Sequence, residues 1–189
     1  GFCVGAVDKA NLIDGSKVKV GDVLVGLPSS GCHSNGFSLI RKILFKDHQL
    51  KLDEYMPELG KTLGEEILTP TKIYVKAIKH LFGKVDLHGM SHVTGGGFYE
   101  NIPRMLPDDG VRAVVRKDSY EVPAIFRLLA DKGNIEEQMM YNTYNMGIGM
   151  VLAVDPSEVE AAMAAVREAG ETPYVIGEVE AGEKGVVLC

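Results

Sequence analysis

Two short loops of glycine and polar residues hold the side chains of this chain that could bind or transform a ligand. The first loop is Ser29-Ser30-Gly31-Cys32-His33-Ser34-Asn35-Gly36, and the second loop is Ser91-His92-Val93-Thr94-Gly95-Gly96-Gly97. Each follows an apolar run that predicts a strand, at 23–28 and 85–90, and precedes a stretch with the apolar spacing of a helix. Unpaired N–H groups at a helix start bind anions, and consecutive glycines leave the backbone uncovered for a phosphate. The loops therefore predict a phosphate site; the alternative is that the glycines only form tight turns.

Each loop contains one histidine, and His33 is the candidate proton carrier. His33 stands between small residues, so we expect it outside the core, where it could donate to a phosphate oxygen or transfer a proton near neutral pH. Its alternative role is a surface histidine that caps its own turn. His92 follows an apolar strand, which favours for it a buried histidine whose hydrogen bonds are satisfied within the protein.

Hydroxyl and amide side chains complete the candidate site. The serines of the first loop would be nucleophiles only beside an activating base, and no Gly-x-Ser-x-Gly elbow is present, so hydrogen bonding to a ligand or to a helix start is favoured. Asn145 lies in a third turn, residues 142–147, where Gly147 permits close backbone approach or a strand bulge. Three asparagines offer neutral donors and acceptors suited to a sugar or an amide: Asn35, Asn101 and Asn145.

Other features exclude several classes of function. No P-loop lysine motif or Gly-x-Gly-x-x-Gly fingerprint occurs, and Asp86, Asp108 and Asp109 form no evident Mg²⁺ cluster, so we assign no metal ligand. A net charge of −6 without a basic run argues against a nucleic-acid surface. No apolar stretch is long enough to cross a bilayer and no signal peptide is visible, which argues against a membrane protein. The scattered, odd number of cysteines is typical of a reduced, cytoplasmic protein.

Hydrophobic periodicity predicts the elements that must position these loops. The run 23–28 is apolar on both faces, as in a strand buried on both sides of its sheet. A helix follows the first loop, with Ser34 or Asn35 as its cap, and another is expected over 72–82, capped by Thr69-Pro70-Thr71. Residues 47–68 have weak periodicity and predict an irregular excursion.

The ends of the chain and its last third indicate the domain organisation. Residues 2–7 predict an opening strand, and residues 146–180 predict a β-α-β unit. The 189 residues show no repeat or linker and predict a single α+β domain, a mixed sheet of five to seven strands flanked by helices in an α/β/α layered arrangement. Because the chain opens without an initiator Met and closes on apolar residues, we expect a domain excised from a longer protein.

Four stretches together resemble one enzyme family. They are Leu27-Pro28-Ser29-Ser30-Gly31-x-His33-Ser34-Asn35-Gly36-Phe37-Ser38-Leu39, Leu68-Thr69-Pro70-Thr71-Lys72-Ile73-Tyr74-Val75, His92-x-Thr94-Gly95-Gly96-Gly97-Phe98-x-Glu100-Asn101-Ile102-Pro103-Arg104 and Tyr144-Asn145-Met146-Gly147-Ile148-Gly149-Met150. In register over most of the chain, they resemble the carboxy-terminal half of aminoimidazole ribonucleotide synthetase, also called phosphoribosylformylglycinamidine cyclo-ligase. Thr-Gly-Gly-Gly alone also occurs in relatives such as formylglycinamide ribonucleotide amidotransferase and selenophosphate synthetase.

The resemblance implies an ATP-dependent ligase of purine biosynthesis, in which ATP activates the formamide oxygen of formylglycinamidine ribonucleotide and the amidine nitrogen closes the imidazole ring. It implies that Thr94 and the glycines of the second loop hold the substrate phosphate, and that Ser30 shares the cleft with the catalytic pair. The expected catalytic residues are His33 and Asn35. The expected substrate- or phosphate-binding residues are Ser29, Ser30, Gly31, Ser34, Thr94, Gly95, Gly96, Gly97, Asn101 and Asn145.

The resemblance also implies what this chain lacks. Most ATP contacts, the Mg²⁺-binding aspartates and much of a homodimer interface would belong to an amino-terminal domain that is absent here. We therefore expect the chain alone to be inactive and to bind neither ATP nor Mg²⁺ tightly. Cys32 falls at a position that the family leaves variable and is assigned no role. The alternatives are a phosphate-binding module without chemistry, or another member of the same superfamily.

Overall fold

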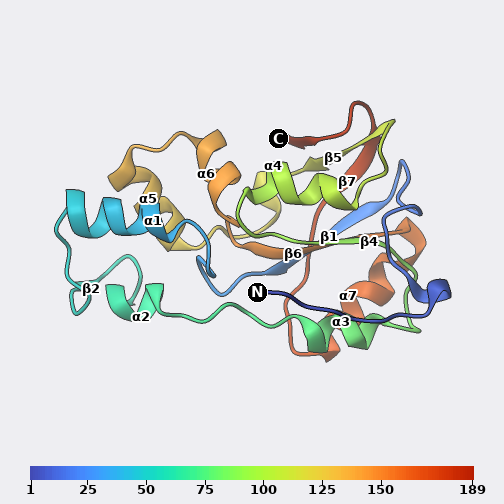
Figure 1. Ribbon diagram of the computed structural model, residues 1–189, viewed down its shortest axis with the longest axis horizontal. Coiled ribbons are helices and arrows are strands. Elements are labelled where there is room, and N and C mark those ends of the chain that lie inside the picture. Colours follow the sequence, from blue (N-terminus) through green and yellow to red (C-terminus); the bar gives the residue numbers. More distant parts are fainter.

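A six-stranded sheet forms the centre of the computed structural model, which describes residues 1–189 (Figure 1). Every neighbouring pair of strands is antiparallel except β5 and β8, which are parallel. The predicted mixed sheet of five to seven strands is thus confirmed. In sheet order the strands are β4 (Leu87–His92), β6 (Ile148–Val154), β1 (Val23–Pro28), β7 (Tyr174–Ala181), β5 (Val111–Val115) and β8 (Val186–Leu188).

β1 lies inside the sheet because its side chains are apolar on both faces. Successive side chains of a strand point to opposite faces. Leu24 is fully buried in the core on one face, and Val25 and Leu27 are fully buried in the core on the other. A chain segment of this kind gains free energy only where both faces are covered, as the sequence predicted.

Helices cover both faces of the sheet and make the predicted α/β/α layers. On one face α3 (Val75–Leu81) packs beside α7 (Val159–Glu168). The other face carries α4 (Gly97–Asn101), η3 (Ile102–Met105), α5 (Ala124–Gly133) and α6 (Glu137–Thr143). In Figure 1, α3 and α7 lie below the strands and α4 lies above them. No helix combines the length and the apolar character that crossing a bilayer requires.

Shorter elements complete the chain. α1 (Phe37–Arg41) continues into a π-helical segment, η2 (Lys42–Asp47), which packs against α5. The remaining elements are the 3₁₀ helices η1 (Lys9–Asn11), η4 (Lys117–Ser119) and η5 (Pro156–Glu158) and the elements of residues 55–67, β2 (Tyr55–Met56), β3 (Lys61–Thr62) and α2 (Leu63–Ile67).

Residues 146–180 form the predicted β-α-β unit as β6, α7 and β7. Both strands are antiparallel to β1, which lies between them, so β6 and β7 run parallel to one another. Asp155 caps the turn that enters the helix, where its Oδ1 accepts a hydrogen bond from the Ser157 N–H at 3.0 Å.

Two of the predicted segments are wrong. Residues 2–7 have no strand partner, and Phe2 is 96% exposed. Alternating apolar residues form a strand only where a neighbour pairs their backbone groups. Residues 47–68 are more regular than predicted, because β2 and β3 pair and Thr62 caps α2. Thr62 and Glu65 form a capping box, in which each side chain accepts a hydrogen bond from the other residue's N–H.

The predicted helix caps around the first loop are also wrong. α1 is preceded by Gly36 with φ 71°, and Ser34 instead hydrogen-bonds the hydroxyl of Thr71 at 2.8 Å. α3 begins only at Val75, because the chain before it is held across the first loop. There the Ser30 hydroxyl donates to the carbonyl of Pro70 at 2.7 Å.

Candidate functional site

Three turns meet at one end of the sheet. β1 and β4 are both antiparallel to β6, so the carboxyl ends of β1 and β4 lie beside the amino end of β6. Backbone hydrogen bonds join them there: the Ser29 N–H donates to the Gly147 carbonyl at 2.8 Å, and the Val93 N–H donates to the Gly149 carbonyl at 2.8 Å. The first loop, the second loop and the third turn therefore form one contiguous site.

Three aromatic side chains form the centre of this site, and we call His33, Tyr74 and His92 the histidine cluster. Their ring centroids are 6.2 Å apart for His33 and Tyr74, 6.2 Å for the two histidines and 5.8 Å for Tyr74 and His92. Tyr74 and His33 cover Gly149, where a Cβ would overlap the Tyr74 hydroxyl and stand 2.7 Å from His33 Cε1. The Tyr74 hydroxyl donates to the Pro28 carbonyl at 2.9 Å, which fixes the ring against β1.

The hydrogen bonding of His33 identifies its proton. Its Nε2 accepts from the Ser30 N–H at 3.1 Å, so the neutral ring carries its proton on Nδ1. Nδ1 is buried without a hydrogen-bond partner. Burial, and then the charges of His92 and Lys72, lower the pKa of His33 to about 4. His33 is therefore neutral near pH 7 and leaves one donor unpaired.

The burial of the two histidines is the reverse of what the sequence favoured. His33 is only 4% exposed and adopts φ 55°, whereas the expectation put it outside the core. His92 is exposed at the end of β4, so the alternative of a buried, satisfied histidine is wrong for it. Partial burial still lowers the pKa of His92. The fold encloses His33 because residues 69–74 cover the first loop.

The second loop leads from β4 into α4 as predicted, with Gly97 as the first helical residue. Asn101, buried to 1% exposure, holds its shape. The Asn101 amide donates to the carbonyls of Gly95 at 3.1 Å and Gly97 at 2.8 Å, and its oxygen accepts from the Thr94 hydroxyl at 3.0 Å. The side chains of Asn101 and Thr94 thus bond to the loop itself.

The three glycines of the second loop have different surroundings. A Cβ on Gly97 (φ 57°) would overlap the Tyr141 carbonyl, and a Cβ on Gly96 (φ 94°) would overlap the Glu100 carboxylate. At Gly95 the one neighbour is Asn35 Oδ1, 3.7 Å from the Cβ position. Gly95 therefore faces the first loop, whereas glycine is required at the other two positions by packing and by backbone conformation.

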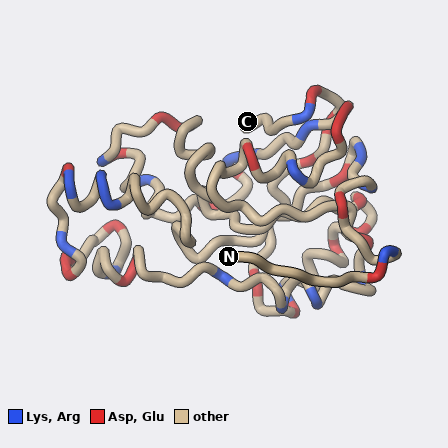
Figure 2. Tube along the Cα trace, viewed as in Figure 1, with Lys and Arg blue, Asp and Glu red and all other residues tan.

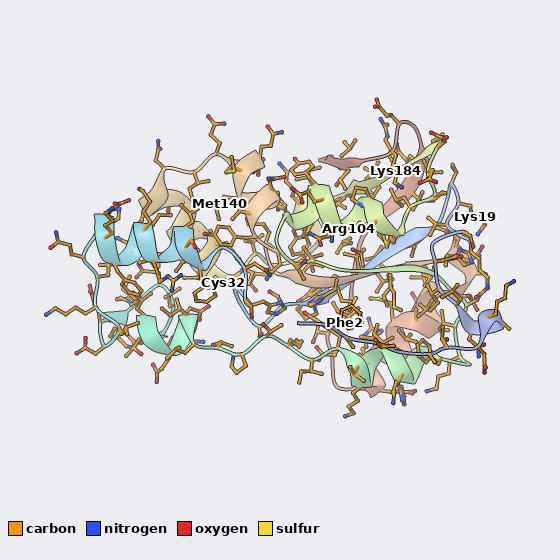
Figure 3. The ribbon with its side chains drawn as sticks, viewed as in Figure 1. Phe2, Lys19, Cys32, Arg104, Met140 and Lys184 are labelled. Atoms are coloured by element: carbon orange, nitrogen blue, oxygen red, sulfur yellow. The ribbon has the colours of Figure 1, made fainter.

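The remaining residues of the first loop are tied to neighbouring segments. Asn145, fully buried, donates to the Gly31 carbonyl at 2.8 Å and accepts from the Gly147 N–H at 2.9 Å, so it joins the first loop to the third turn. Ser29 Oγ accepts from the Gly31 N–H at 3.4 Å. Cys32 is buried, which raises the pKa of its thiol to about 12, and Figure 3 shows it where the first loop leaves the sheet.

Two residues of the site were missed by sequence reasoning, and both lie in the stretch that covers the first loop. Tyr74 is 5% exposed and completes the histidine cluster; burial, and then the charge of Glu171, raise its pKa. Lys72 pairs with Glu171 at 2.8 Å. The available signal was the polar segment Thr69-Pro70-Thr71-Lys72, which indicates a helix start and lies in one of the four stretches of the family resemblance.

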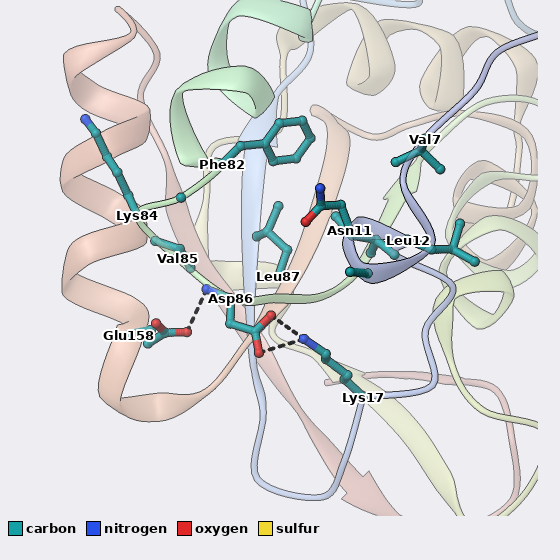
Figure 4. A pocket seen from close by; sticks show the side chains of 13 residues that line it. Val7, Asn11, Leu12, Lys17, Phe82, Lys84, Val85, Asp86, Leu87 and Glu158 are labelled. Carbon is teal, nitrogen blue, oxygen red and sulfur yellow. Dashed lines mark hydrogen bonds and ion pairs between the residues drawn. The ribbon is translucent and has the colours of Figure 1, made fainter.

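The site does not contain the ligands of a divalent metal. No three His, Cys, Asp or Glu side chains come together in the chain, whereas Mg²⁺ prefers clustered carboxylates. A cavity of about 790 Å³ lies elsewhere, between residues 7–17 and residues 82–87 (Figure 4). There Lys17 pairs with Asp86 at 2.6 Å, and the Asp86 N–H donates to the Glu158 carboxylate at 3.0 Å.

The chain is similar to known proteins both in sequence and in fold. The phosphoribosylformylglycinamidine cyclo-ligase of Lachnospira eligens is 64% identical along the whole chain, which covers 55% of that relative. The chain thus spans about half the length of the curated relatives it matches. Among solved structures, thiamine-monophosphate kinase from Stenotrophomonas maltophilia K279a has a TM-score of 0.65 at 16% identity, covering 96% of this chain and 54% of that one.

A second solved structure, the hydrogenase maturation protein HypE in complex with ATP, has a TM-score of 0.59 at 17% identity, covering 92% of this chain and 49% of that one. At such identities these likenesses show the fold alone. The model of one protein family matches residues 19–189. The chain therefore belongs to the family described as AIR synthase related protein, C-terminal domain.

Proposed function

We propose that this chain is the carboxy-terminal, substrate-binding part of an ATP-dependent cyclo-ligase that converts formylglycinamidine ribonucleotide to aminoimidazole ribonucleotide in purine biosynthesis. The observation that carries the proposal is the 64% identity, along the whole chain, to the cyclo-ligase of Lachnospira eligens. The meeting of the two loops with the third turn supports it independently, because these are the segments with ligand-binding chemistry.

The proposed reaction needs precise positioning more than it needs reactive side chains. The γ-phosphoryl group of ATP passes to the formamide oxygen, and ADP leaves. The amidine nitrogen then attacks the activated carbon, the C–O bond breaks as phosphate departs, and loss of a proton completes the imidazole. Phosphoryl transfer is accelerated chiefly by orientation and by charge stabilisation, for which fixed backbone and amide donors are suited.

The residues of the site divide into those that would contact the ligand and those that hold the loops. We propose that Gly95 and Asn35, which face one another, receive the substrate phosphate. His33 is a neutral donor in this scheme, because its Nδ1 proton is the one that the protein leaves unpaired. Asn101 and Asn145 act on the ligand through the loop shapes that their hydrogen bonds maintain.

The rest of the enzyme would supply the groups that this chain lacks. We propose that ATP contacts, Mg²⁺ ligands and the homodimer interface lie largely in an amino-terminal part. The cavity in Figure 4 belongs to the surface that would meet it, since Val7, Leu12 and Phe82 are each more than half exposed there. A cytoplasmic location fits the three unpaired cysteines.

The test uses the complete protein and measures ADP release from ATP and formylglycinamidine ribonucleotide. We expect turnover, and we expect Gly95→Val to raise KM for the ribonucleotide at least roughly tenfold without a change in Tm, because its side chain would enter the ligand space. Gly185→Val is the matched control, since its nearest neighbour is 4.0 Å away on the surface. Ribonucleotide binding without ADP release would refute the ligase and indicate a binding module. An unchanged KM would remove Gly95 from the site.

A further inference from the structure

The two loops, the third turn and the residues that flank them carry no formal charge, although the proposed ligand is a phosphate ester. Residues 24–40, 87–99 and 141–154 contain no Lys, Arg, Asp or Glu. In Figure 2 the blue and red charged residues lie mostly around the outside of the molecule, and much of the centre is tan. A dianionic phosphate is bound most strongly by charge-assisted hydrogen bonds, so a cation supplied by another segment would complete such a site.

Lys72 brings a positive charge to the histidine cluster. It follows Thr71, which hydrogen-bonds the first loop, and precedes Tyr74 of the cluster by two residues. Its ammonium lies 2.8 Å from the Glu171 carboxylate, and the two side chains are only 25% and 20% exposed. The charge of Lys72 lowers the pKa of His33 and that of Glu171 raises the pKa of Tyr74, which agrees with both charges lying beside the cluster.

We propose that Lys72 is a binding residue of this site, whose ammonium contacts the phosphate of the ligand while Glu171 holds it beside the histidine cluster. The proposal rests on the proposed function for the identity of the ligand. An ammonium group has three N–H donors, and an ion pair with one carboxylate oxygen leaves others available. The half-buried setting strengthens the contact, because water screens the charge less there than at the surface.

A second lysine near the same helices provides a matched control. Lys84 follows α3 and pairs with Glu168 at the end of α7, at 2.9 Å, but these side chains are 46% and 60% exposed. The Lys84 ammonium is also within 3.0 Å of His80, which is not a member of the cluster. Lys84 therefore reproduces the lysine–glutamate pairing of Lys72 without its position in the site.

The experiment titrates ribose 5-phosphate, and ribose as the uncharged comparison, into the complete protein by calorimetry. We expect Lys72→Met to weaken ribose 5-phosphate binding roughly 10- to 100-fold, the range of a charge-assisted hydrogen bond, with ribose binding and Tm unchanged. Lys72→Arg should restore most of the affinity, and Lys84→Met should bind like the unaltered protein. Glu171→Gln should weaken binding less than Lys72→Met, because the ammonium remains.

Three other outcomes would refute either the Lys72–phosphate contact or the proposed function. Equal affinity of Lys72→Met and the unaltered protein for ribose 5-phosphate would refute the contact and leave the proposed function standing. Failure of the unaltered protein to bind ribose 5-phosphate would refute the contact as well. Lys72-dependent binding by a protein that releases no ADP would refute the proposed function and leave the phosphate contact in place.

Discussion

Substitution of Gly149 by alanine should disrupt the histidine cluster, because the added methyl group would overlap Tyr74 and His33. Gly149 lies in β6, and a Cβ there would overlap the Tyr74 hydroxyl, stand 2.9 Å from Tyr74 Cζ and stand 2.7 Å from His33 Cε1. Overpacking of this kind costs about 1–3 kcal/mol. Displacing Tyr74 also breaks its 2.9 Å hydrogen bond to Pro28, worth about 1 kcal/mol. We therefore expect the free energy of unfolding to fall by about 2–4 kcal/mol.

Thermal unfolding of this chain measures that loss. For a domain of this size, about 2–4 kcal/mol corresponds to a fall in Tm of roughly 5–15 °C. The control is Gly185→Ala, where the nearest atom is 4.0 Å from the Cβ position and Tm should not move. Tyr74→Phe removes the overlapping oxygen. The double variant Gly149→Ala/Tyr74→Phe should therefore lose less unfolding free energy than the two single variants lose in total. Additive losses, or an unchanged Tm for Gly149→Ala, would refute this description of the cluster.

Three further predictions concern the site and its incompleteness. Because the pKa of His33 in the folded chain is about 4 rather than 6.5, its contribution to stability is full above pH 6.5 and is lost as the pH falls toward 4. The free energy of unfolding of the unaltered chain should therefore fall as the pH is lowered from 6.5 to 4, and that of His33→Asn should fall by up to about 3 kcal/mol less. Denaturant titration at each pH measures both; parallel plots of unfolding free energy against pH would contradict this. Asn101→Ala removes four side-chain hydrogen bonds inside the second loop. It should destabilise the chain by about 2–4 kcal/mol and speed hydrogen exchange at Gly97; normal exchange would show that the loop does not need Asn101. The chain alone should release no ADP from ATP and formylglycinamidine ribonucleotide, because no carboxylate cluster offers a metal site. ADP release should appear when the proposed amino-terminal part is added. Turnover by the chain alone would mean that the ATP site is misplaced.

Local sequence patterns were sufficient for the framework. Three features follow from patterns that act over a few residues: hydrophobic periodicity, helix caps and the backbone freedom of glycine. They are the strand β1, apolar on both faces, the turn from β4 through glycines into α4, and the β-α-β unit of the last third. The opening segment shows the limit of that reasoning. Residues 2–7 have the alternation of a strand, but a strand needs a partner, and none pairs with them.

The environment of each site residue was decided by tertiary structure. The sequence predicted a site role and an exposed position for His33 and favoured a buried position for His92. His33 is instead buried because the chain before α3 crosses the first loop, and His92 is exposed at the end of β4. Lys72 meets Glu171 across 99 positions of the chain, and Asn145 reaches the carbonyl of Gly31 across 114. No local pattern specifies such contacts, because they depend on the order of strands in the sheet and on which helix covers which face. Residue types thus predicted which loops form the candidate site, and only the packing of distant segments decided which donors are left unpaired and which hold the loops in place.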